Sequence, residues 1–309
     1  MTILKTHDLS KRYKTYYALD KVNMTIEEGD IYGFVGENGA GKTTLIRAIT
    51  GLISSYGSYE LFGVSSKSEQ IYEKRRLVSS IVESASINKS MTAQENIRLQ
   101  AFAHGTKIDD EKISSLLNKV GLDEKKIAKK KAKDFSLGMR QRLGIALCLI
   151  NNPKFIILDE PMNGLDPSGF IEVRELILSL ASQGITFLIS SHILGELDKI
   201  CNKVGFLSHG KLLEEISMEE LHKKTRSNTK ITFRKIDDIN ENIIEKLNLH
   251  DYRIEGNNLF VYDQIDINLI MRVLVSENIE IESITSSNES IEDYYFKIMR
   301  EAQQNEKIA

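Results

Sequence analysis

A short glycine-rich segment, placed between an apolar stretch and a helical pattern, is the part of this chain best suited to chemistry. Residues 36–44 read Gly-Glu-Asn-Gly-Ala-Gly-Lys-Thr-Thr. Their three glycines allow successive backbone N–H groups to point inward without Cβ clashes, and a helix that begins near Lys42 adds its positive dipole end. Lys42 would reach the β- and γ-phosphates as a point charge, and the Thr43 hydroxyl would bind Mg²⁺. The segment therefore predicts a cradle for a polyphosphate.

Two adjacent carboxylates form a second candidate group. Asp159 and Glu160 follow an apolar strand pattern at residues 155–158. Because successive strand side chains point in opposite directions, Asp159 would hold the Mg²⁺ shell while Glu160 would project past the strand end and polarise an attacking water. Taken alone, such a pair is usually a solvated strand end. Downstream of a phosphate cradle, it predicts a hydrolytic pair.

The elements around these residues indicate an α/β fold. Residues 31–35 are short and mostly apolar, as a buried strand is, and residues 45–49 suit a helix. From residue 3 to about 215, short apolar strands alternate with helical patterns, which indicates a mainly parallel sheet. Residues 86–150 are helical in pattern and read as an insert. We therefore expect one nucleotide-binding domain over residues 1–215.

The last third of the chain has a different pattern. A polar stretch at residues 218–228 indicates a junction to a second unit, which we assign to residues 216–309. From residue 229 it reads as strand, helix, two strands, helix, strand and helix, with a hairpin turn at residues 256–258. We expect a small accessory α+β domain without catalytic spacing of its own.

The length of the chain suits two domains, and its composition is that of an ordinary protein. The 309 residues are 41% apolar and 28% charged, and the net charge of −3 gives no reason to expect nucleic acid as a partner. The longest apolar run, residues 145–150, is shorter than the roughly 18 residues that a membrane span needs, and no hydrophobic secretion segment is present at the start. Cys148 and Cys201 are expected to be reduced and buried. We expect a cytoplasmic location.

Over about residues 3–215, these motifs together resemble the ATP-binding subunit of an ATP-binding cassette (ABC) transporter. Residues 36–44 and 155–160 match the Walker A and Walker B sequences of that family. Residues 136–142, Ser-Leu-Gly-Met-Arg-Gln-Arg, resemble its signature motif. Residues 164–166 correspond to the D-loop. The resemblance implies a P-loop NTPase fold with a helical insert at about residues 86–150.

The resemblance also implies a set of site residues. The catalytic residues would be Glu160, His192 (the switch histidine) and Lys42. The ligands of Mg²⁺ would be Thr43, Asp159 and Glu83. Contacts to ATP are expected from Tyr13, Gly36, Asn38, Gly39, Ala40, Gly41, Lys42, Thr43, Thr44, Glu83, Ser136, Gly138 and Asp166. In the family, Tyr13 corresponds to the aromatic that stacks on adenine, and the helix that Ser136 would cap closes over the nucleotide of a partner copy.

Two departures from the family pattern indicate one subgroup of the family. Glu83 stands where most members have glutamine, and Leu137 and Met139 replace the usual glycine and glutamine of the signature. This combination is similar to the subgroup that exports, or confers immunity to, peptide antibiotics of the bacitracin and lantibiotic type. A carboxylate near the γ-phosphate repels it unless a metal or a proton compensates, so Glu83 bears on hydrolysis rate and coupling rather than on ATP binding.

The resemblance implies an ATPase at the cytoplasmic face of the membrane. It would be peripheral, would form a homodimer, and would drive a separate membrane-spanning permease subunit without any nucleic acid partner. One rival is a soluble cassette ATPase that acts on ribosomes or DNA, and another is a non-transport regulator that senses ATP. A single motif set, an unbroken spacing from Gly41 to Gly138 and the acidic balance favour the transporter.

Overall fold

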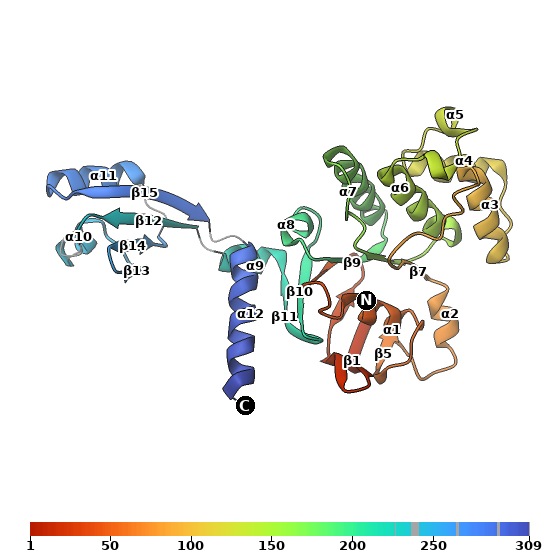
Figure 1. Cartoon of the computed structure of the whole chain (residues 1–309), viewed down its shortest axis with the longest axis horizontal. Coiled ribbons are helices and arrows are strands. Elements are labelled where there is room, and N and C mark those ends of the chain that lie inside the picture. The colour runs from red at the N-terminus through yellow and green to blue at the C-terminus, as the bar shows by residue number, and fades with distance from the viewer. Residues whose placement is uncertain (226, 236–240, 264–265, 289–290, 309) are drawn as a thin grey trace. The chain divides into compact units, whose positions relative to one another are not determined.

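The computed structural model describes residues 1–225, 227–235, 241–263, 266–288 and 291–308, which fall into two compact units (Figure 1). The first unit runs from Met1 to Met218 and the second from Glu219 to Ala309. The helix α9 (Met218–Lys224) begins at this boundary, in a stretch that the sequence indicates only as a polar junction.

A six-stranded sheet forms the centre of the first unit. Across the sheet the strands are β11 (Lys211–Ser217), β10 (Lys203–Ser208), β4 (Ile31–Val35), β9 (Thr186–Ser191), β8 (Phe155–Asp159) and β7 (Val78–Ile81). All pairs are parallel except β10 with β11. Every residue of β4, β8 and β9 is buried, which explains their largely apolar sequences. The carboxyl ends of these parallel strands meet at one edge of the sheet.

A second, antiparallel sheet in the first unit was not predicted. It consists of β1 (Thr2–Tyr13), β2 (Tyr16–Val22), β3 (Thr25–Glu27), β5 (Tyr56–Leu61) and β6 (Val64–Ser65). The register of β1 against β2 shifts twice between Leu9 and Arg12, and these irregularities interrupt the alternation of buried and exposed residues. The strict period of two by which a strand is recognised is therefore lost in β1.

Helices surround the parallel sheet and form the insert. They are α1 (Lys42–Ile49), α2 (Ile71–Arg75), α3 (Ala93–Ala103), α4 (Asp110–Lys119), α5 (Glu124–Ile127), α6 (Leu137–Cys148), α7 (Pro167–Ser182) and α8 (Leu194–Leu197). The helices α3 and α4 pack on α6, which packs on α7. Thr92 and Glu95 form a capping box at the start of α3. Figure 1 shows α3 to α6 gathered together, away from β1 and β5.

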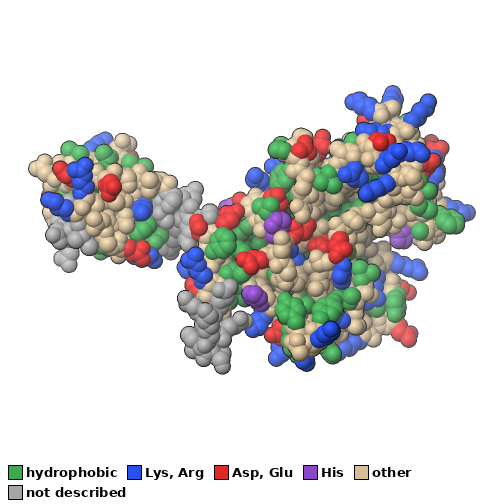
Figure 2. All heavy atoms as spheres, viewed as in Figure 1, with side chains coloured by type: hydrophobic (Ala, Val, Ile, Leu, Met, Phe, Trp, Pro, Cys, Tyr) green, Lys and Arg blue, Asp and Glu red, His purple; other side chains and the backbone are tan. Residues whose placement is uncertain are grey.

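Lysine and arginine side chains cluster at the outer end of this insert (Figure 2). Around α5, the lysines at 125, 126, 129, 130, 131 and 133 are all exposed. They form a solvated, positively charged surface.

A buried cluster joins both sheets of the first unit to α1. It includes Leu4 from β1, Phe34 from β4, Leu45 from α1, Tyr59 from β5 and Ile157 from β8, all at most 4% exposed. Burying an aliphatic or aromatic side chain of this size stabilises the fold by about 1.5–3 kcal/mol. Packing between two sheets therefore fixes α1, and with it the loop that precedes α1.

The second unit is a four-stranded antiparallel sheet with helices. Its elements are β12 (Ser227–Phe233), α10 (Glu241–Lys246), β13 (Tyr252–Glu255), β14 (Asn258–Val261), α11 (Ile267–Ser276), β15 (Ile281–Asn288) and α12 (Ile291–Ile308), in the predicted order. The sequence pattern predicts the first helix over residues 239–247, of which residues 239–240 lie outside the described residues. The strand order β13-β14-β12-β15 is that of a split β-α-β-β-α-β unit. The hairpin turn lies where it was predicted, because Glu255 pairs with Asn258.

Within the described ranges, no helix combines the length and apolar character that crossing a bilayer would require.

Candidate functional site

The loop between β4 and α1 contains the glycine-rich segment. A Cβ atom on Gly36 would lie 2.6 Å from the backbone oxygen of Leu207, and one on Gly41 would lie 2.3 Å from that of Ala18. Gly41 also has a φ of +113°, which side-chain-bearing residues rarely adopt. Any side chain at either glycine would displace the backbone. The fold therefore requires glycine at both places and leaves the inner wall of the loop to N–H groups.

The ammonium group of Lys42 points back into this loop. Its Nζ donates hydrogen bonds to the carbonyl oxygens of Gly36 (2.6 Å) and Glu37 (3.2 Å), and lies 3.3 Å from Glu160 Oε1. The side chain is only 6% exposed. A charge this deeply buried requires oxygen partners, so these contacts hold it where the oxygens of a phosphate chain would meet it.

Asp159, at the end of β8, is buried and uses both of its oxygens. Thr43 Oγ1 donates to Oδ2 at 2.8 Å, and Ser190 Oγ donates to Oδ1 at 2.5 Å. One carboxylate beside one hydroxyl suits Mg²⁺, which keeps several waters and binds substrate phosphates rather than an all-protein cage. Among the described residues, no group of three or more His, Cys, Asp or Glu side chains could hold a metal ion. Thr43 and Asp159 thus fit the ion that the sequence predicts.

Glu160 connects Lys42 to His192. Its Oε2 lies 2.6 Å from His192 Nδ1, while Oε1 faces Lys42. Its backbone has a φ of +50°, and its N–H lies within hydrogen-bonding distance of the carbonyl (3.2 Å) and Oγ (3.0 Å) of Ser190. Such a conformation costs about 1–3 kcal/mol and persists only where surrounding contacts enforce it. The strained backbone thus accompanies a carboxylate that faces Lys42 and His192.

Two residues near Glu160, namely Ser190 and Glu196, were not predicted from the sequence. Ser190 holds both Asp159 and the backbone of Glu160, and its only sequence signal is a hydroxyl near the end of the next parallel strand. Glu196 lies in the same depression as Glu160 and His192, and burial raises the pKa of its carboxyl. Ser191 Oγ is 3.4 Å from Glu196 Oε2.

A cavity of about 290 Å³ opens in front of the glycine-rich loop. Its lining residues are Tyr13, Tyr16, Ala18, Asn38, Gly39, Gly41, Lys42, Thr43, Thr44 and Glu160. Tyr13 and Tyr16 face each other across the β1–β2 hairpin, and both rings are about half exposed. Their flat apolar faces at the mouth suit an aromatic base, so Tyr16 joins the predicted Tyr13 as a candidate. Gly36 and Ala40 belong to the loop without lining the cavity.

Three predicted residues lie elsewhere in the unit. Ser136 caps α6 and accepts a hydrogen bond from the Met139 N–H at 3.1 Å. Asp166 caps α7, and hydrogen bonds from Ser168 and the Gly169 N–H lower the pKa of its carboxyl.

Gly138 lies where α6 packs on α7, and a Cβ there would make only an ordinary van der Waals contact, 3.4 Å, with Gly169 Cα. None of these three helix-end residues lines the cavity around Lys42.

Glu83 also lies outside this cavity. Its side chain is 65% exposed, and its Oε1 is 2.5 Å from Arg47 Nη2. The sequence placed Glu83 among the Mg²⁺ ligands. The structure pairs it with an arginine of α1 instead of with Thr43 or Asp159.

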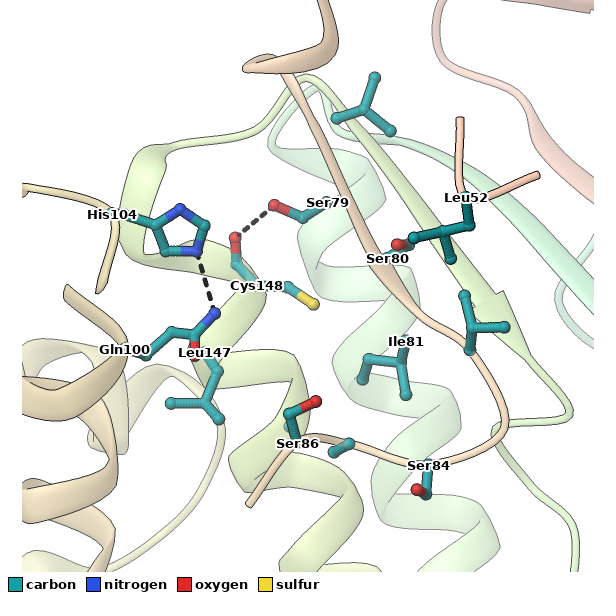
Figure 3. A pocket seen from close by; sticks show the side chains of 14 residues that line it. Leu52, Ser79, Ser80, Ile81, Ser84, Ser86, Gln100, His104, Leu147 and Cys148 are labelled. Atoms are coloured by element: carbon teal, nitrogen blue, oxygen red, sulfur yellow. Dashed lines mark hydrogen bonds between the residues drawn. The ribbon is translucent and has the colours of Figure 1, made fainter. Parts of the chain in front are cut away.

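A larger groove of about 410 Å³ lies between β7, the segment after it, α3 and α6 (Figure 3). Ser79 Oγ donates to the Cys148 carbonyl at 3.0 Å, and Gln100 Nε2 lies 2.9 Å from His104 Nε2.

Burial raises the pKa of the Cys148 thiol to about 12, and burial likewise raises the pKa of the Cys201 thiol. Both cysteines are free and buried, as predicted.

The amino-acid sequence is similar to those of known ATP-binding transport proteins. The family described as "ABC transporter" matches residues 19–163. A bacitracin transport ATP-binding protein from Bacillus licheniformis is 40% identical over 309 residues, covering 96% of this chain and 97% of that protein. A lantibiotic transport ATP-binding protein from Streptococcus pyogenes is 43% identical over 213 residues, covering 69% of this chain and 90% of that protein.

Solved structures resemble the first unit. A nucleotide-free ATP-binding cassette from an ABC transporter has a TM-score of 0.64 at 26% identity, covering 71% of this chain and 93% of that one. A dimeric cassette bound to ADP and phosphate has a TM-score of 0.62 at 24% identity, covering 70% of this chain and 99% of that one, and this likeness is one of fold.

Proposed function

The chain belongs to the ABC transporter family as an ATP-binding subunit that hydrolyses ATP, and we propose that it drives a separate membrane-spanning subunit which moves peptide antibiotics. The observation that carries the catalytic part is the position of Glu160, with Lys42 at one oxygen and His192 at the other. This carboxylate stands at the wall of a cavity that also contains Thr43 and the glycine-rich loop.

Each residue has one task in the proposed reaction. Lys42 and the loop N–H groups bind the β- and γ-phosphates, and Thr43 with Asp159 holds Mg²⁺. When bound, Mg²⁺ neutralises charge on the phosphate oxygens. Glu160 polarises a water and accepts its proton. The water oxygen bonds to the γ-phosphorus as the bond to the β–γ bridging oxygen breaks, giving ADP and phosphate. His192 orients Glu160 and contacts the γ-phosphate.

A second copy of the chain would complete each site. Ser136, Gly138 and Asp166 mark helix starts that do not line the cavity of their own chain. The N-terminus of α6 carries a positive dipole end, which favours a bound anion. In the proposed head-to-tail dimer this end meets the γ-phosphate held by the partner, so that ATP joins the two copies.

The proposed membrane partner and the proposed cargo are based on similar proteins. Two of them, named above, are bacitracin and lantibiotic transport proteins, and the first is similar over nearly the whole chain, including the second unit. The departures at Glu83, Leu137 and Met139 point to the same subgroup. The proposed location is peripheral, at the cytoplasmic face of the membrane, through contact with the permease. The second unit would have an accessory role in that complex.

Deletion of the gene with complementation tests this function. Cells that lack the protein should become more sensitive to bacitracin or a lantibiotic, and the wild-type gene should restore resistance while Glu160→Gln should not. Affinity purification from mild detergent should recover a polytopic membrane protein. Recovery of RNA or DNA with unchanged antibiotic sensitivity would instead favour a cassette ATPase that acts on ribosomes or DNA.

A further inference from the structure

An ion pair lies one helical turn from the proposed Mg²⁺ centre. Thr43 Oγ1 donates to Asp159 at 2.8 Å, and Arg47 Nη2 lies 2.5 Å from Glu83 Oε1. Thr43 and Arg47 are four residues apart on α1, so their side chains share one face of that helix. The same face of α1 therefore contacts two carboxylates in succession.

The register of the sheet places these two carboxylates at one edge. The strands β7 and β8 are parallel neighbours, with Ile81 opposite Leu158. Asp159 comes one residue after Leu158, and Glu83 comes two residues after Ile81. Since paired strands lie about 4.8 Å apart, the backbone leaves β7 toward Glu83 next to the end of β8 that carries Asp159.

The backbone holds Glu83 in an unusual conformation. Its φ is +62°, and the Ser84 N–H donates to the Val82 carbonyl at 2.7 Å, which closes a three-residue turn around it. Val82 and Ser84 both line the groove of Figure 3, whereas Glu83 does not. The turn thus separates Glu83 from the groove while its two neighbours form part of the groove wall.

A carboxylate beside a bound γ-phosphate needs a compensating positive charge. We propose that Arg47 is this charge: from α1 it pairs with Glu83, outside the cavity, and so keeps this carboxylate from repelling bound ATP. The inference rests on the proposed function of that site. Both side chains are exposed, at 38% and 65%, so the pair adds little to folding stability and its effect falls on the nucleotide.

A purely structural role for Arg47 is the competing account. Arg47 lies in the last turn of α1, where a cation stabilises the negative end of the helix dipole. That role does not depend on the charge of residue 83. The two accounts therefore differ in whether removing the charge of Glu83 repairs the loss of Arg47.

Equilibrium binding of a fluorescent, non-hydrolysable ATP analogue and of fluorescent ADP, both with Mg²⁺, tests the proposal on the full chain. Arg47→Gln should weaken binding of the ATP analogue about 5- to 10-fold, because one uncompensated charge interacts at close range in a partly screened site. Its effect on ADP, which lacks the γ-phosphate, should be smaller. Glu83→Gln should bind the analogue about as wild type does, and the double variant should match Glu83→Gln.

Controls separate this effect from a general loss of surface charge. Arg98→Gln removes another exposed arginine that pairs with an acid, Asp110, and should leave both affinities unchanged. Arg47→Lys keeps the charge and should keep most of the preference for the ATP analogue, which provides a test if Arg47→Gln folds poorly.

Three outcomes would overturn the proposal: no loss with Arg47→Gln, equal loss for both nucleotides, or a double variant as weak as Arg47→Gln. Failure of the wild-type protein to bind ATP would instead contradict the proposed function.

Discussion

Two helix starts in the first unit are built in opposite ways. At α1 the N-cap residue is Gly41, and no side chain caps the helix. At α6 the N-cap residue is Ser136, whose hydroxyl accepts a hydrogen bond from the Met139 N–H. The first helix start opens into a cavity with a lysine, a hydroxyl and a carboxylate, whereas the second does not line that cavity.

The difference supports the proposal that one chain forms only part of a site. The start of α1 leaves its N–H groups to a ligand and supplies the charge to hold it. The start of α6 is stabilised by its own serine and can therefore exist at the surface, ready to meet a ligand held by another molecule. In the proposed dimer, the catalytic groups come from the first region, and the second region contributes only after assembly.

Removing the charged carboxylate of Glu160 while leaving both helix starts intact should have the largest effect on the rate of ATP hydrolysis. Glu160→Gln should bind ATP yet hydrolyse it at least about 100-fold more slowly, since positioned bases contribute about 10²–10⁴-fold. It should also accumulate as an ATP-bound dimer, measured by size-exclusion chromatography with light scattering. Unchanged turnover would remove Glu160 from its proposed role.

Disabling the α1 side alone should abolish most nucleotide binding. Lys42→Ala should lower ATP affinity about 10- to 100-fold, because hydrogen bonds to charged groups contribute about 1.5–3 kcal/mol each. Fluorescence titration measures this loss, and circular dichroism checks the fold. A folded variant with normal ATP binding would contradict the cradle assignment.

Disabling the α6 side should leave ATP binding by the single chain nearly unchanged. Ser136→Ala removes a helix cap, which should reduce folding stability by about 1 kcal/mol. It should also weaken ATP-dependent dimer formation several-fold, measured by sedimentation. Asp109→Ala is the matched control, because it removes the side-chain cap of α4 and should cost similar stability without affecting dimerisation. Equal dimerisation by the two variants would count against a role for Ser136 in the interface.

The sequence predicted the elements whose patterns are local. The buried strands β4, β8 and β9 have continuous apolar runs, and β12 to α12 follow in the predicted order. The antiparallel sheet was missed because irregular pairing interrupts the alternation of β1.

Site residues were missed for a different reason. Ser190, Tyr16 and Arg47 have common side chains, and their importance comes from partners that the fold brings near them. Arg47 lies 36 residues before Glu83 in the sequence, so only the packing of α1 beside β7 and β8 shows that the two charges meet.

Disulfide trapping tests the two-chain site most directly. Asn38 lines the cavity and Leu137 is 41% exposed at the start of α6, so Asn38→Cys and Leu137→Cys report on the two regions separately. The native thiols are buried, with raised pKa values, and should not compete. In a Glu160→Gln background, a mixture of the two variants should form a disulfide between chains under mild oxidation, and should do so only with Mg-ATP. Absence of that disulfide, or equal yield without nucleotide, would contradict a site shared between two copies.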